Sequence, residues 1–118
     1  MNNLINIFKL LSDETRIRII MLLDADQLCV CQITGILNIS QPKASKVLSK
    51  LRDLGLVTDE RQEKFVYYSL NKNHKLLKHI LDFINVNITD YDTIHEDLNR
   101  LSLKEEFLTT CNKTTLKV

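Results

Sequence analysis

A chain of 118 residues, 44% of them hydrophobic and 26% charged, has the length and composition of one globular domain with a single core. Its net charge of +1 identifies no class of partner, and no apolar stretch approaches the roughly 20 residues of a membrane-spanning helix. The first residues lack a signal-peptide pattern and the cysteines number three, so we expect a cytoplasmic protein without a disulfide framework.

The first part of the chain predicts three helices. Residues 3–11 form an amphipathic helix whose apolar positions recur at helical spacing: Leu4, Ile5, Phe8 and Leu11. Residues 12–23 form a second helix, with Ser12 as its expected N-cap and apolar residues around most of its circumference. A short third helix follows over residues 30–37.

A longer helix is predicted between Ser40, which suits an N-cap, and Gly55, which suits a C-terminal cap. The other faces carry amide, hydroxyl and lysine side chains, and one face is an apolar stripe formed by Val47, Leu48, Leu51 and Leu54. Lysines bind phosphates, whereas Gln and Ser side chains reach base edges, so this helix is suited to a DNA groove. The candidate DNA-binding residues on it are Gln41, Lys43, Ser45, Lys46, Ser49 and Lys50.

A β-hairpin comes next, with strands expected at Leu56–Arg61 and Phe65–Leu70 around a charged turn. Helical spacing returns over residues 74–84, breaks at residues 85–90 and resumes over residues 91–101. The predicted fold is mostly α with a small β-hairpin, a winged helix-turn-helix. We expect residues 1–88 to form the DNA-binding and dimerisation domain, and residues 89–118 a C-terminal helical extension and tail.

Charge and hydrophobicity both indicate partners. Residues 41–72 carry seven basic and four acidic residues, a balance of +3, whereas residues 82–106 have a balance of −5. A basic middle followed by an acidic tail indicates an electrostatic footprint on one part of the fold. The apolar first and fifth helices would leave hydrophobic faces exposed on a monomer. They predict a homodimer that presents two recognition helices to successive major grooves.

Four segments resemble, in their order and spacing, the ArsR-type family of metal- and metalloid-responsive repressors: FKLLSDETRIRIIMLL, LCVCQI, SQPKASKVLSKLRDLGLV and KFVYYSL. The resemblance implies a dimeric winged-helix repressor that binds operator DNA when metal-free and leaves it when an inducer binds. It places the recognition helix at residues 41–54 and the wing tip at residues 61–64, where Arg61 and Lys64 are candidates for phosphate contact. We expect no enzymatic activity, because no cysteine has a recognisable base beside it.

Cys29 and Cys31 in the LCVC segment resemble the inducer site of the arsenic- and cadmium-type members. Soft thiolates select soft ions, so we expect As(III) or Sb(III), with Cd(II) or Pb(II) as the alternative. Positions two residues apart on a helix point about 200° from each other. Cys29 and Cys31 therefore cannot bind one ion from an intact helix, so we expect inducer binding to unwind its first turn. Arsenic-type members often have a third cysteine where this chain has Thr34. Three alternatives follow: Cys111 is the third ligand, a small molecule completes a two-thiolate site, or Cys111 is structurally idle.

Other readings remain open from the sequence. The same thiols suit a redox-sensing repressor that forms disulfides, and a helical interaction module without DNA affinity is a further possibility. Zinc-sensing relatives place ligands along the fifth helix at a fixed spacing that His74 and His79 do not match. A solvated acidic surface explains the other candidate oxygen and nitrogen ligands more simply: Asp90, Asp92, His95 and Glu96.

Overall fold

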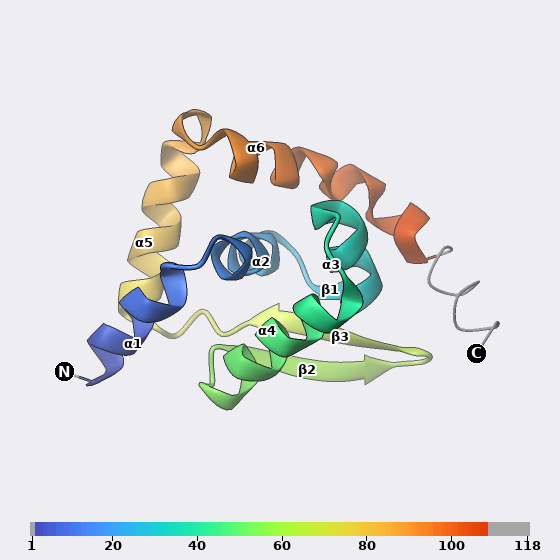
Figure 1. Cartoon of the computed structure of the whole chain (residues 1–118), viewed down its shortest axis with the longest axis horizontal. Coiled ribbons are helices and arrows are strands. Elements are labelled where there is room, and N and C mark those ends of the chain that lie inside the picture. Colours follow the sequence, from blue (N-terminus) through green and yellow to red (C-terminus); the bar gives the residue numbers. More distant parts are fainter. Residues whose placement is uncertain (1, 109–118) are drawn as a thin grey trace.

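The computed structural model describes residues 2–108 and confirms the predicted winged helix-turn-helix architecture (Figure 1). The elements follow in the order α1 (Asn2–Leu11), α2 (Glu14–Ala25), β1 (Leu28–Cys29), α3 (Val30–Leu37), α4 (Gln41–Asp53), β2 (Val57–Gln62), β3 (Phe65–Leu70), α5 (Lys75–Val86), η1 (Ile88–Asp90), α6 (Asp92–Asn99) and η2 (Arg100–Leu103). Residues 104–108 add a last helical turn. No helix among the described residues is long and apolar enough to cross a membrane.

Helix α2 is the centre of the core, as its sequence predicts. Its buried positions lie on every side: Thr15, Ile19, Ile20, Met21, Leu22 and Leu23. The expected cap is wrong by one residue, because Asp13 rather than Ser12 accepts the Arg16 N–H, at 3.0 Å. The Ser12 hydroxyl instead donates to the Lys9 carbonyl, at 2.6 Å, and so closes the end of α1.

The helix-turn-helix has the predicted end signals. Helix α3 ends at Asn38 in the left-handed conformation (φ 56°), Ser40 accepts the Lys43 N–H at 3.3 Å, and Gly55 has a φ of +76° after α4. Glycine adopts this φ without steric cost, so the chain turns sharply into β2. The expectation that Leu54 joins the apolar stripe of α4 is wrong, since 45% of Leu54 is exposed, and Ala44 is buried in the stripe instead.

The sheet has three antiparallel strands in the order β1-β3-β2, one more than the predicted hairpin. The β2–β3 register runs from Val57↔Leu70 to Gln62↔Phe65, which leaves a two-residue loop of Glu63 and Lys64 at the wing tip. Strand β2 begins and ends one residue later than expected. The unexpected strand, β1, pairs Cys29 with Tyr67 of β3.

Helix α6 packs on α2, on the side of the molecule opposite the β2–β3 hairpin (Figure 1). Ile94 of α6 is buried in the core. A bidentate ion pair joins the two helices, in which Arg18 Nε and Nη2 donate to the two Asp97 carboxylate oxygens at 2.8 and 2.9 Å. The Asp97 side chain is 5% exposed, so its charge depends on this one partner for compensation.

We expect Asp97→Ala to lower the free energy of unfolding by about 2–3 kcal/mol, because it leaves the partly buried guanidinium of Arg18 unpaired. Urea denaturation at one fixed protein concentration measures this loss. Asp82→Ala is the matched control, since Asp82 pairs with Lys78 in full solvent and should change stability by less than about 0.5 kcal/mol. Equal losses in the two variants would contradict an anchoring role for the α2–α6 pair.

Candidate functional site

The outer face of α4 carries the candidate DNA-binding side chains. Those of Gln41, Lys43, Lys46, Ser49 and Lys50 are exposed, and Ser45 is half-buried. On the wing, Arg61 and Lys64 are exposed as well. The structure thus brings all eight predicted residues to the surface, on two elements that follow one another in the chain.

One contact between α4 and the wing was not predicted from the sequence. Arg52 Nη1 donates to Asp59 Oδ2 of β2 at 3.2 Å. Both side chains are largely exposed, so the pair contributes little to stability, but it links the orientation of the wing to that of α4.

Cys29 lies at the junction of β1 and α3 and not within the helix. It is the N-cap of α3, with extended backbone (φ −91°, ψ 170°), and only 2% of it is exposed. Cys31 is half-buried in the first turn of α3. The premise that both cysteines lie on one helix is therefore wrong, and their spacing does not by itself require α3 to unwind.

Burial raises the pKa of the Cys29 thiol above its usual value, and the nearby carboxylate of Glu105 acts in the same direction. The backbone N–H of Gln32, at the start of α3, opposes the shift because it stabilises the thiolate. A soft ion that binds Cys29 must therefore displace a proton, so its affinity should fall as the pH falls.

Gln32 is a buried polar residue that fixes the Cys29 backbone. Its Oε1 accepts the Cys29 N–H at 3.1 Å, and its Nε2 donates to the Lys104 carbonyl at 3.3 Å. Only 2% of Gln32 is exposed. A glutamine three residues after a helix N-cap is a capping-box signal, so the sequence contained a sign of this role.

Residues 100–108, here called the C-terminal arm, lie along α3 (Figure 1). Arg100 Nε and Nη2 donate to the Ile36 and Gly35 carbonyls at 2.8 and 3.1 Å. These bonds satisfy carbonyls in the last turn of α3 that have no helical partner. The Lys104 ammonium forms an ion pair with Asp26, just before β1.

Phe107 lies directly against Gly35 of α3. A Cβ at position 35 would fall 2.2 Å from a Phe107 ring carbon, so only glycine fits this contact. The arm therefore contacts both ends of α3, beside Cys29 and at Gly35. Cys111, predicted as a third ligand, lies outside the described residues.

The remaining metal candidates do not come together. Within residues 2–108, no group of three or more Cys, His, Asp or Glu side chains is arranged to hold a metal ion. His74 caps α5, where its Nδ1 accepts the Leu77 N–H at 3.3 Å, and His79 is exposed. The acidic residues Asp90, Asp92 and Glu96 are exposed, as a solvated surface requires.

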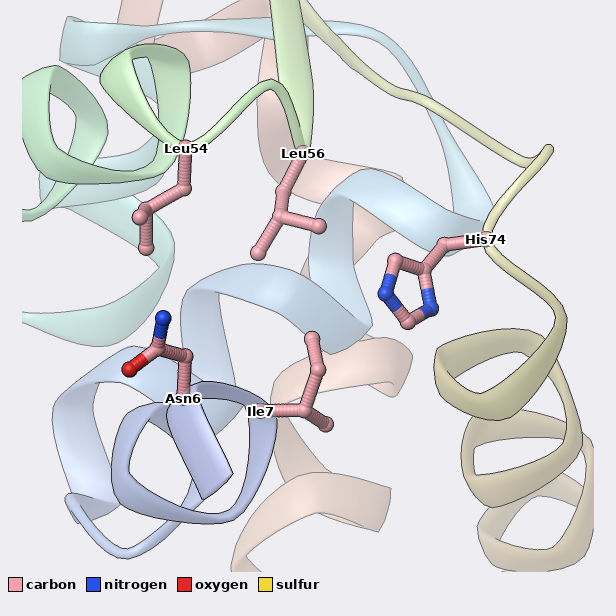
Figure 2. A pocket seen from close by; sticks show the side chains of 5 residues that line it. All are labelled: Asn6, Ile7, Leu54, Leu56 and His74. Carbon is pink, nitrogen blue, oxygen red and sulfur yellow. The ribbon is translucent and has the colours of Figure 1, made fainter. Parts of the chain in front are cut away.

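A small pocket of about 150 Å³ lies where α1, the end of α4 and the start of α5 meet (Figure 2). Three apolar side chains and two polar ones line it: Ile7, Leu54, Leu56, Asn6 and His74. Because the His74 Nδ1 already has a donor, the pocket offers few free polar groups to orient a ligand. It lies between the first helix, the end of α4 and the residue that caps the fifth helix.

In the Cys31→Ser, Cys111→Ser background, the pH midpoint for alkylation of Cys29 by iodoacetamide should lie above that of the same protein unfolded in urea. The reason is that burial favours the neutral thiol, which does not react. Modification rates measured by mass spectrometry across the pH range give both midpoints. A folded-state midpoint below the unfolded one would show that the fold stabilises the thiolate instead.

Residues 13–59 match the model of the family described as "Bacterial regulatory protein, arsR family". The chain is 49% identical over 67 residues to the arsenic resistance transcriptional regulator ArsR2 of Pseudomonas putida, covering 56% of this chain and 58% of that protein. It is 44% identical over 71 residues to the cadmium resistance transcriptional regulatory protein CadC of Listeria innocua, covering 59% of each. The chain thus spans little more than half the length of these relatives.

A longer match is to the transcriptional repressor SdpR of Bacillus subtilis, with 37% identity over 82 residues, 68% of this chain and 91% of SdpR. The crystal structure of the transcriptional repressor BigR from Xylella fastidiosa superposes with a TM-score of 0.63 at 26% identity, covering 76% of this chain and 87% of BigR. The chain therefore belongs to the ArsR family of bacterial regulatory proteins and has its winged helix-turn-helix fold.

Proposed function

We propose that this chain is a DNA-binding transcriptional repressor that a soft metalloid or metal releases from its operator. The observation that carries the proposal is the position of Cys29 and Cys31 at the start of α3, directly before the exposed polar face of α4. The names of ArsR2 and CadC refer to arsenic and cadmium resistance. We propose As(III) or Sb(III) as the inducer, with Cd(II) or Pb(II) as the alternative.

DNA binding would use the faces already described. Helix α4 enters the major groove, where Gln41, Ser45 and Ser49 reach base edges and the lysines contact phosphates. Arg61 and Lys64 of the wing contact the backbone. The carboxylates of Glu60 and Glu63 reduce the positive potential of the wing, so we assign it phosphate contacts and no base readout.

The inducer would bind the thiolates of Cys29 and Cys31, which suit a soft ion in chemistry. Cys111 is our proposed third ligand. The arm supports delivery from the same protomer, because Phe107 packs on Gly35, one helical turn from Cys31 on the same face of α3. The three residues from Leu108 to Cys111 span at most about 10 Å. This reach is comparable with the length of the one helical turn between Gly35 and Cys31.

Release from DNA would follow from the connection between the two helices. Only the three-residue turn 38–40 separates α3 from α4, so a change at α3 reaches the recognition helix directly. The Gln32 bonds to the Cys29 N–H and the Lys104 carbonyl belong to the described conformation. An inducer that holds the Cys29 backbone in another conformation must break or change these bonds. The shift between the described conformation and the inducer-bound one is set by the difference in the inducer's affinity for the two.

A homodimer through α1 and α5 would cover apolar residues that the described chain leaves exposed. These residues are Leu4, Ile5 and Phe8 on α1, and Phe83 and Val86 on α5. Phe83 is 62% exposed and Val86 is 83% exposed, which is unusual for large apolar side chains close together on one helix. A symmetric contact would also place two α4 helices for two half-sites.

A mobility-shift assay on the DNA upstream of the gene, under anaerobic reducing conditions, tests the proposed function. As(III) or Sb(III) should release the wild-type protein. Cys29→Ser and Cys31→Ser should each need at least about tenfold more inducer, because two sulfurs no longer act together. Thr34→Ala, next to the site but without a sulfur, should respond like the wild type.

Three outcomes of the same assay decide between the alternatives. Release of both serine variants at the wild-type inducer concentration would overturn the thiolate site. Release only by peroxide, reversed by a thiol, would establish the redox-sensing function. A wild-type response in Cys111→Ser would remove Cys111 from the ligand set.

We expect Phe83→Glu to convert the dimer into a monomer and to weaken operator binding, because a carboxylate cannot be buried without a partner at the interface. Sedimentation velocity gives the oligomeric state, and circular dichroism checks the fold. Lys78→Gln, an exposed change elsewhere on α5, should remain dimeric. A dimeric Phe83→Glu variant would place the interface elsewhere.

A further inference from the structure

A basic pocket of about 340 Å³ lies between the start of α2 and one edge of α4. Seven residues line it: Asp13, Thr15, Arg16, Lys43, Lys46, Val47 and Lys50. Four of them carry a positive charge and one carries a negative charge. Its lining is more basic than those of the pocket beside His74 and of two further pockets, beside Asp97 and beside Lys72.

The one carboxylate of this basic pocket is already engaged. Asp13 Oδ2 accepts the backbone N–H of Arg16, at 3.0 Å, and so caps α2. The guanidinium of Arg16 has only a long contact, 3.5 Å, with the Lys9 carbonyl. Among residues 2–108, no ion pair involves Arg16, Lys43, Lys46 or Lys50. These four cations, against the single carboxylate of Asp13, leave the pocket with a net positive charge that attracts an anion.

The place of the basic pocket on α4 identifies that anion. Lys43, Lys46 and Lys50 are spaced three and four residues apart, so they form one edge of the helix, facing α2. Arg52, on the other edge, is bonded to Asp59 of the wing. The centre of the exposed face, with Ser49, therefore lies between the basic pocket and the wing. When a helix lies in the major groove, its two edges face the two phosphate backbones.

We propose that the basic pocket binds a phosphodiester of the operator backbone and that Arg16 of α2 contacts this phosphate. The inference rests on the proposed DNA-binding function and adds a contact from outside the recognition helix. A guanidinium suits this role because its planar fork donates two parallel hydrogen bonds to phosphate oxygens. The three lysines then bind backbone, and sequence readout falls to the amide and hydroxyl side chains of α4.

The salt dependence of DNA affinity tests this assignment. Each neutralised phosphate contributes about 0.9 to the slope of log affinity against log salt concentration. Arg16→Gln should lower the magnitude of that slope by about 1 and weaken binding to the operator and to an unrelated duplex by the same factor, roughly tenfold at 0.15 M salt. Fluorescence anisotropy with both duplexes at five salt concentrations measures the two effects.

Two further variants separate a phosphate contact from other causes. Lys78→Gln removes one positive charge from α5 and should leave the slope near the wild-type value. Arg16→Lys keeps the charge, so it should keep the slope and lose only part of the affinity. Circular dichroism shows whether Arg16→Gln folds. If it does not, Arg16→Lys still tests the role of the guanidinium by its loss of affinity.

The outcomes distinguish this inference from the proposed function. A slope for Arg16→Gln equal to that of Lys78→Gln, or a loss of affinity confined to the operator, would overturn the phosphate contact while DNA binding stands. No salt-dependent affinity of the wild-type protein for any duplex would overturn the proposed function and this inference with it.

Discussion

Helix α2 has apolar side chains on every side of its middle, so it is stable only when other elements surround it. The rest of the fold meets that requirement. Helices α1, α3, α4 and α6 and strand β3 all contact α2. Two polar groups of α2 have specific partners, since Arg18 pairs with Asp97 and the Arg16 N–H in the first turn donates to Asp13. The positions of α3, which carries Cys31, and of α4 therefore both depend on one central element.

The cysteine pair occupies a junction between two kinds of structure. Cys29 ends a strand that is held by β3, whereas Cys31 lies in the first turn of α3. Gln32 joins this junction to the C-terminal arm through two hydrogen bonds. A change in the backbone at Cys29 therefore affects β3, α3 and the arm together. This arrangement connects a buried sulfur to α4, which presents the proposed DNA-binding side chains, without any long chain of contacts.

Local signals predicted much of this structure. Ser40 and Gly55 mark the ends of α4 by their own hydrogen bonding and φ preference, and apolar spacing predicted α3 and α5 close to their observed bounds. Strand β1 was missed because two residues are too few to show a period of two. The error at Ser12 has a similar cause, since Ser12 and Asp13 both suit a cap and only their tertiary setting assigns one to each helix.

The candidate site was predicted less completely, because its remaining parts are contacts between distant segments. Arg100 binds carbonyls of α3, and a backbone carbonyl leaves no mark in the sequence. The basic pocket joins Arg16 to lysines nearly thirty residues later, a separation that no periodicity links. The cysteines and the exposed face of α4 were identifiable because each consists of neighbours in the chain.

The contact between Gly35 and Phe107 has a consequence for the path of the C-terminal arm. A single methyl group at position 35 would occupy the space of the Phe107 ring, so the arm lies on α3 in this way only when that residue is glycine. The missing side chain at position 35 thus helps to set where residues 100–108 lie in this chain. Together with the Arg100 hydrogen bonds, it keeps them on the helix that carries Cys31.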